Sequence, residues 1–168
     1  AKAFLHNFTF TNMGSQFAGS VCAMEVASTI SNVVARQVGK KWTGATDGTR
    51  YPFLLSAGTL THCWITNNVM PNNAGAALSG SAVMENCLVA DNVDRGCAQA
   101  SSVLGGVVRI SGNNAVIRNC TIVSNSSPYS AVWVRNYNNN HIYDGAKSQL
   151  YNNIIWNNCT NSTPESLY

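Results

Sequence analysis

The stretch Val116–Asn125 reads VIRNCTIVSN, and its pattern recurs along the chain. The pattern is an apolar residue, a variable residue and Asn, then a small or apolar residue, a variable residue, an apolar residue and a polar pair that usually ends in Asn. Five other segments align with it position by position: Leu5–Asn12, Ile30–Gln37, Leu60–Asn68, Met84–Asn92 and Leu150–Asn158. Such self-similarity indicates a repeat architecture in which each unit packs on its neighbours.

A second apolar segment precedes most of these repeats. The segments that we expect to form this second set of strands are Val21–Val26, Pro52–Ser56, Ala76–Ser79, Val107–Ser111 and Ala131–Arg135. Gly and Asn separate the two sets, and both residues accept positive φ angles, so they predict turns. No stretch shows a sustained helical period, and the many Val, Ile and Thr residues favour strands.

Within one unit, the inward-facing pattern changes parity once. Ile117, Cys120 and Ile122 are the predicted inward residues, and Asn119 stands where the alternation breaks. A strand alternates its faces strictly, so the break requires a bend, and Asn is the non-glycine residue that best tolerates a left-handed bend. We expect an asparagine ladder whose amides stack from unit to unit, with His62 in one unit and these five elsewhere: Asn7, Asn32, Asn86, Asn119 and Asn152.

Three of the six cysteines occupy one inward position in three units. Cys63, Cys87 and Cys120 therefore predict a stacked column of buried thiols. An adjacent pair could instead form a disulfide, because neighbouring units lie within reach of one. The pairing of the other three cysteines cannot be read from their positions: Cys22, Cys97 and Cys159.

Neither a metal site nor a cofactor is expected. The chain contains no C-x-x-C motif, and the three histidines, His6, His62 and His141, are far apart in the sequence.

These features together resemble the right-handed parallel β-helix of pectate-lyase-like proteins. The resemblance is carried by the repeat length, the Asn at the bend, the stacked Cys and Ile positions and the Gly105–Gly106 opening of one unit. The sequence pattern Cys-Thr-Ile…Asn is similar to the repeats of large secreted or surface-attached bacterial proteins. The resemblance covers residues 4–160 and implies an all-β, right-handed parallel β-helix, a solenoid of about six coils. We expect residues 1–168 to form a single β-helix domain that is a segment of a longer chain or assembly.

Composition narrows the choice of partners and of compartment. Charged residues make up 10% of the chain, below the ~25% of an ordinary globular protein, which suits a sheet-rich extracellular or cell-surface protein. The net charge of +3 is small and its basic residues are scattered, so no nucleic-acid partner is expected. No apolar run approaches the ~20 residues of a membrane span.

The acidic residues do not form a pattern that predicts catalysis. The resemblance implies that lyases of this kind bind Ca²⁺ through an acidic cluster and that hydrolases pair Asp residues on neighbouring coils. Asp91 and Asp94 are close together, but the next unit has Ser124 where Asp91 stands. We interpret both aspartates as turn residues and predict no catalytic residue.

One outward surface remains as a candidate ligand site. Arg109, Trp133 and Arg135 are outward positions of the second set of strands, and Trp beside Arg suits the stacking of a sugar or the binding of an acidic glycan. The alternative is that Trp133 packs under the loop Asn138–Ser148.

The sequence therefore predicts a structural or adhesive protein that can stack end to end on other copies of itself into a filament. The alternatives are a polysaccharide lyase or glycoside hydrolase, and a non-catalytic glycan-binding module with a polysaccharide partner.

Overall fold

The computed structural model describes residues 2–11, 22–24, 27–38, 51–70, 75–94, 106–111, 114–128, 130–135, 137–138, 141–142 and 148–160. Every regular element in these ranges is a short β-strand, as the alternating apolar pattern predicted. The strands gather into four parallel sheets, which we name A to D, and one small antiparallel hairpin.

Sheets A and B contain the strands of the repeated pattern, which splits in two at its Asn. Sheet A consists of β1 (Phe4–His6), β4 (Thr29–Ser31), β7 (Thr59–Thr61), β11 (Val83–Glu85), β15 (Val116–Arg118) and β21 (Gln149–Tyr151). Sheet B consists of β2 (Thr9–Thr11), β5 (Val34–Arg36), β8 (Trp64–Thr66), β12 (Leu88–Ala90), β16 (Thr121–Val123) and β22 (Ile154–Trp156).

The other strands complete the circuit. Sheet C contains the five strands of the predicted second set: β3 (Cys22–Met24), β6 (Phe53–Leu55), β10 (Ala76–Ser79), β14 (Val108–Ser111) and β18 (Val132–Arg135). Sheet D was not predicted; its strands are β9 (Val69–Met70), β13 (Val93–Asp94), β17 (Ser126–Ser127) and β23 (Cys159–Thr160). The hairpin pairs β19 (Tyr137–Asn138) with β20 (His141–Ile142).

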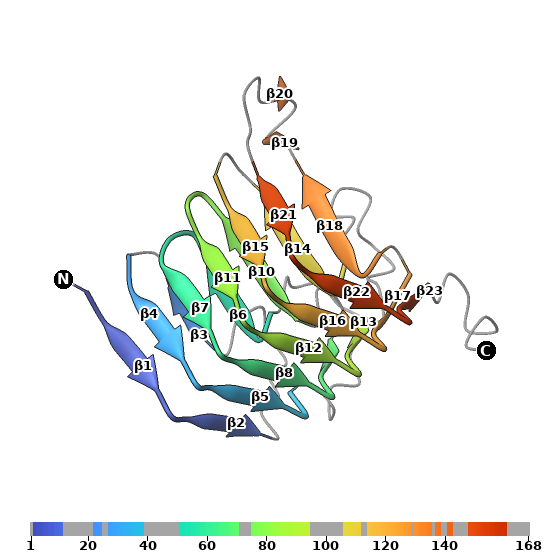
Figure 1. Cartoon of the computed structure of the whole chain (residues 1–168), viewed down its shortest axis with the longest axis horizontal. Helices are drawn as coiled ribbons and strands as arrows, with labels where there is room; N and C mark the ends of the chain where they lie inside the picture. The colour runs from blue at the N-terminus through green and yellow to red at the C-terminus, as the bar shows by residue number, and fades with distance from the viewer. Residues whose placement is uncertain are drawn as a thin grey trace.

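The chain visits these sheets in a fixed order. From β7 in sheet A it passes through β8, β9 and β10, and it then returns to sheet A as β11 beside β7 (Figure 1). Each such passage is called a unit below. Strands of successive units pair in parallel and in register, so that Leu60 lies beside Met84 and Met84 beside Ile117. This arrangement of stacked parallel strands is that of a parallel β-helix or solenoid.

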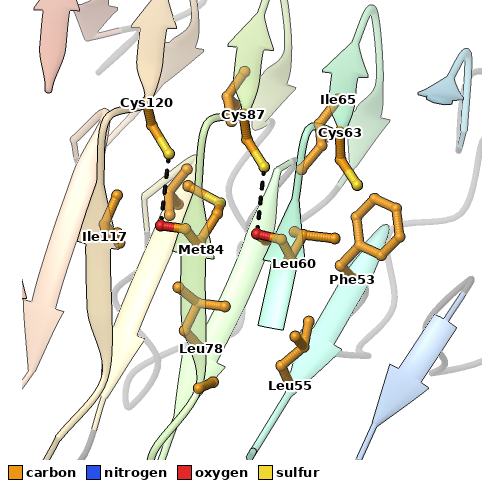
Figure 2. Packing of buried hydrophobic residues seen from close by; sticks show 14 of the residues in the cluster. Phe53, Leu55, Leu60, Cys63, Ile65, Leu78, Met84, Cys87, Ile117 and Cys120 are labelled. Atoms are coloured by element: carbon orange, nitrogen blue, oxygen red, sulfur yellow. Dashed lines mark hydrogen bonds between the residues drawn. The ribbon is translucent and has the colours of Figure 1, made fainter. Parts of the chain in front are cut away.

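The core runs through the stack between the sheets. Its members include Ile30, Leu60 and Ile117 of sheet A, and Ile65 and Ile122 of sheet B, all fully buried. Figure 2 shows side chains from sheets A and C meeting in this interior. Burial of apolar area of this kind is the main favourable contribution to folding.

Two sharp bends in each unit shape the coil. The first lies between sheets A and B and has positive φ at all six predicted positions: Asn7, Asn32, His62, Asn86, Asn119 and Asn152. The second follows sheet B, was predicted only as a turn at Asp91, and has positive φ at Gln37, Asn67, Asp91, Ser124 and Asn157. Left-handed residues turn the strand direction within one residue, which lets each short strand end without a loop.

Glycine is required where sheet C begins. A Cβ on Gly75 would lie 2.8 Å from the carbonyl oxygen of Val107, and one on Gly106 would lie 2.7 Å from that of Ser130. These openings therefore bring neighbouring backbones closer than a side chain allows.

In the part of the chain that the structure describes, no helix is long and apolar enough to cross a membrane.

Candidate functional site

The structure brings two of the three predicted ligand residues together on sheet C. Arg109 of β14 and Trp133 of β18 are register partners on adjacent strands, and the guanidinium carbon lies 5.2 Å from the centroid of the indole ring. This distance is within the range of a cation–π contact. Arg135 lies opposite Ser111 in the same strand pair, but its side chain is outside the described residues.

A tyrosine holds the arginine from the other side. Nη1 of Arg109 donates a hydrogen bond of 3.3 Å to the hydroxyl of Tyr51, which is buried. The Nε of Arg109 is also buried and has no hydrogen-bond partner among the described residues. The pair is thus half-buried and leaves little open platform for a sugar ring.

The first-bend asparagines point to solvent. All five predicted ladder residues have exposed side chains: Asn7, Asn32, Asn86, Asn119 and Asn152. Their backbone N–H groups carry the contact to the next unit, as in the bond from Asn86 to the carbonyl of Arg118 at 3.2 Å. Their role in the described structure is therefore that of left-handed bend residues.

A hydrogen-bonded amide ladder exists one bend later. Asn68, Asn92 and Asn125 are fully buried and continue into Asn158. The Nδ2 of Asn68 donates to the Oδ1 of Asn92 at 2.9 Å, and the backbone N–H of Asn68 donates to the same oxygen at 3.0 Å. The same pair of bonds joins Asn92 to Asn125 and Asn125 to Asn158.

The second amide hydrogen of this ladder is satisfied as well. The Nδ2 of Asn92 donates to the carbonyl of Ile65 at 2.8 Å, and that of Asn125 to the carbonyl of Val89 at 3.0 Å. Buried amides are costly unless they are hydrogen-bonded, and here each satisfies backbone groups of its neighbours. The signal in the sequence was the Asn that ends most copies of the pattern.

Three thiols form a second interior column beside the first bend. Cys63, Cys87 and Cys120 are buried, free of disulfides, and point in the same direction on successive units (Figure 2). The thiol of Cys87 donates to the carbonyl of Leu60 at 3.6 Å, and that of Cys120 to the carbonyl of Met84 at 3.7 Å.

The three thiols shift one another's pKa values. Hydrogen bonds to Cys120 and Cys63, together with burial, hold the pKa of Cys87 well above its ordinary value. A hydrogen bond from Cys87 lowers the pKa of both neighbours, Cys63 and Cys120. The middle thiol is therefore the last of the three to lose its proton.

The last unit shows that the two columns have the same geometry. Asn153 continues the thiol column, and its Oδ1 accepts a 2.9 Å hydrogen bond from the backbone N–H of Cys120. Its Nδ2 donates to the carbonyl of Ile117 at 3.0 Å. An amide thus fits the position that a thiol occupies in the three preceding units.

The described carboxylates have structural partners or structural positions. Glu85 forms an ion pair with Arg118 of the next unit, whose Nε donates to it at 2.7 Å, and Arg118 also donates to the hydroxyl of Tyr151 at 3.1 Å. The bonds to Tyr151 and Glu85 raise the pKa of the guanidinium. This row was missed because the charges stand on different units.

The two aspartates differ from each other. Asp91 is an exposed bend residue, as expected. The prediction was wrong for Asp94, which lies in β13, is fully buried and accepts a 3.1 Å hydrogen bond from Ser127. The error arises because sheet D was not predicted, and the chain continues as a strand of this sheet where a turn was expected.

No group of three or more His, Cys, Asp or Glu side chains is placed to hold a metal ion within the described ranges.

The outermost described strands differ from the interior of the stack. Ile117 is fully buried, whereas its register partner Leu150 in β21 is 36% exposed. Likewise Ile122 is fully buried and its partner Ile155 in β22 is 46% exposed. The inward columns therefore end in an apolar surface on β21 and β22.

No family model, curated protein or solved structure matches the chain, so function must be argued from its geometry.

Proposed function

We propose that the protein is a structural or adhesive scaffold of the cell surface or extracellular space, and that it associates end to end with further copies of itself. The observation that carries this proposal is the apolar surface of β21 and β22, where Leu150 and Ile155 are exposed although the residues at these positions in the inner strands are buried. Unpaired strand edges with apolar side chains favour the addition of further strands.

The strand edges at the two ends of the stack are suited to pair with each other. All strands of a sheet run in the same direction, and β1 and β21 lie at opposite ends of sheet A (Figure 1). The hydrogen bonds that join β15 to β21 could therefore be repeated between β21 of one copy and β1 of the next. This head-to-tail contact does not close on itself, so it would generate a filament.

The finer description of the fold belongs to the same proposal. Parallel strands joined by a crossover are right-handed in about 98% of cases, which favours a right-handed β-helix of about six coils. The column of bend asparagines and the Cys column would then be two of its repeated features. A pectate-lyase-like relationship rests on the sequence resemblance.

Mass measurement tests the self-association. Light scattering at several concentrations and electron microscopy of the same sample should show polymers that grow with concentration. Ile155→Lys places a charge on the exposed end of the interior column and should abolish them. Trp64→Lys is the matched control, because Trp64 is 59% exposed on the outer face of sheet B, away from the end strands.

A monomer at every concentration would refute self-association, as would polymers that tolerate Ile155→Lys. A folded monomer would leave the scaffold proposal without its end-to-end contact.

A second candidate is a non-catalytic binding module for acidic polysaccharides. It is favoured by the contact of Arg109 with Trp133, since both side chains are half-buried on sheet C. Binding to an acidic polysaccharide should then be lost in Arg109→Ala and retained in Arg118→Ala, whose guanidinium is already paired with Glu85. Equal binding by both variants would refute this site.

The enzyme alternative has less support. Hydrolysis of a glycosidic bond requires two carboxyl groups on either side of the substrate. Among the described residues, Glu85 is ion-paired, Asp94 is buried, and Asp91 lies on the bend.

A further inference from the structure

The stacking of the strands gives the thiol column a regular spacing. Cys63, Cys87 and Cys120 follow each other on adjacent units, since the N–H of Leu88 donates to the carbonyl of Cys63 and that of Thr121 to the carbonyl of Cys87, each at 2.9 Å. Paired parallel strands lie roughly 4.8 Å apart, so successive Cys side chains repeat at about that distance. Figure 2 shows the three cysteines one after another on successive units, with their side chains pointing the same way.

This spacing is unfavourable for a disulfide. A disulfide requires its two Cβ atoms to be about 3.8 Å apart and its sulfurs about 2.0 Å apart. Side chains that stand parallel at the strand spacing exceed the first distance, and all three cysteines are free thiols. Oxidation would therefore require the backbones of two units to approach each other.

The same spacing suits a metal ion between two sulfurs. With metal–sulfur bonds near the 2.3 Å of a zinc thiolate, a linear S–metal–S group spans roughly 4.6 Å. Soft, closed-shell ions such as Hg²⁺ and the univalent coinage metals prefer thiolates, and a linear geometry requires only two of them. The described structure lacks a cluster of three or more ligands, but a pair is sufficient here.

We propose that Cys87 and one neighbouring thiol, either Cys63 or Cys120, form a two-coordinate site for a soft, closed-shell divalent metal ion such as Hg²⁺ inside the stack. This site goes beyond the proposed scaffold function and does not depend on self-association.

Loading with Hg²⁺ leaves no net charge in the core, whereas a univalent ion held by two thiolates would leave one negative charge there. Hg²⁺ forms two sulfur–metal bonds, two S–H bonds break, and both protons leave to solvent without any change of oxidation state. The product is neutral, which matters because the thiols are surrounded by Ile65, Met84 and Ile117 and an isolated charge there would be costly.

Cys87 is the decisive residue because it belongs to both adjacent pairs. Cys63 and Cys120 are two units apart, roughly 10 Å, so one ion cannot bridge them. The site therefore predicts that either outer thiol is dispensable and that the middle one is not. It also predicts one ion per chain, since the two pairs share Cys87.

The experiment uses the full chain in a background that retains only the column, with Cys22→Ser, Cys97→Ser and Cys159→Ser. The protein is refolded with one equivalent of HgCl₂, because the thiols are buried in the folded state. Native mass spectrometry, ultraviolet thiolate-to-metal absorption and the melting temperature are then measured. We expect one Hg²⁺ per chain, a new absorption band and a raised melting temperature.

Variants of the column decide the outcome. The variants Cys63→Ala and Cys120→Ala should each retain one Hg²⁺ ion. The variant Cys87→Asn should bind Hg²⁺ more than about 100-fold more weakly, because it has no adjacent pair of thiolates to hold the ion together. Asn is chosen because Asn153 already occupies this column. Circular dichroism confirms that each variant folds, and Ala replaces Asn if the Asn variant does not.

Zinc is the control ion. It requires four ligands in a tetrahedron, so Zn²⁺ should neither bind nor raise the melting temperature. The proposal is overturned if the three-thiol protein binds no Hg²⁺, or if the Cys87 variant binds it as tightly as the outer variants.

Discussion

The two bends of each unit have the same backbone conformation, but different side chains follow the left-handed residue. At the second bend, the residue after the left-handed position is a buried Asn in three units, and at the first it is a buried Cys in three units. The Nδ2 of Asn92 donates to the carbonyl of Ile65, and the thiol of Cys87 donates to the carbonyl of Leu60. In both columns an Asn side chain also accepts a backbone N–H of the preceding unit, as Asn92 does from Asn68 and Asn153 from Cys120.

The difference lies in the strength of the bonds. The amide bonds measure about 3 Å between nitrogen and oxygen, whereas the thiols lie 3.6–3.8 Å from the carbonyls of the neighbouring unit. Sulfur is a weak donor and a weak acceptor, so the Cys column depends more on apolar packing. The bend accepts either type of side chain, but only the amide makes strong hydrogen bonds there.

Removal of an amide from the middle of its ladder should have the largest effect. Asn92→Leu leaves the N–H of Asn68 and the carbonyl of Ile65 buried without this partner. Each such group costs about 1–3 kcal/mol, so we expect a loss of roughly 3 kcal/mol in the free energy of unfolding. Urea denaturation measures it, with exposed Ser81→Ala as the control. An unchanged midpoint would show that the ladder contributes no stability.

Substitution in the thiol column should cost less and should depend on the new side chain. Cys87→Ala creates a small cavity and should destabilise by about 1–2 kcal/mol. Cys87→Asn should stay closer to the wild type, since Asn153 makes both hydrogen bonds at this position of the last unit. Thermal melts of both variants compare them directly, and an Asn variant less stable than the Ala variant would contradict the equivalence of the two bends.

The bend itself can be tested without touching either column. Asn86 has a φ of 54° and an exposed side chain, so a substitution there changes mainly the backbone preference. Asn86→Ala should cost about 1 kcal/mol, because a Cβ without a local hydrogen bond disfavours the left-handed region. Asn86→Gly should be nearly neutral in the same denaturation experiment. Equal losses would instead indicate that the Asn side chain itself is required.

The outer ion pair should have the smallest effect. Glu85→Gln removes the charge opposite Arg118, and a pair at the surface contributes little stability. The difference from wild type should shrink further in high salt, which screens exposed charges. A salt-independent difference in melting temperature would show that the row from Glu85 to Tyr151 acts through packing.

The strands of sheets A, B and C and the first bend could be predicted because each has a recognisable local sequence pattern. The parity break at Asn119 predicts a bend, and the apolar runs predict sheets A, B and C. Sheet D has strands of only two residues, such as Ser126–Ser127, which are too short and too polar to show alternation. At each bend the left-handed residue points its side chain to solvent, and the residue after it, such as Asn92, points inward. The spacing of Asn residues in the sequence does not show which of the two positions is buried.

The candidate surface was predicted in part. Arg109 and Trp133 could be placed together because their strands were recognised as neighbours in one sheet. Tyr51 precedes the strand two units earlier, and its contact with Arg109 joins residues 58 positions apart. No local sequence pattern predicts this contact, because it depends on the path of the chain into sheet C.

The spacing between the bends has a consequence for how a chain of this kind can change in length. Successive ladder residues are separated by 24 positions from Asn68 to Asn92 and by 33 from Asn92 to Asn125, yet the paired bends, such as His62 with Asn67 and Asn86 with Asp91, keep one constant separation. Recombination that joined His62 directly to Cys87 would delete one whole unit while both interior columns stayed continuous. Genes of this type can therefore gain or lose coils by unequal crossing-over without passing through a misfolded intermediate.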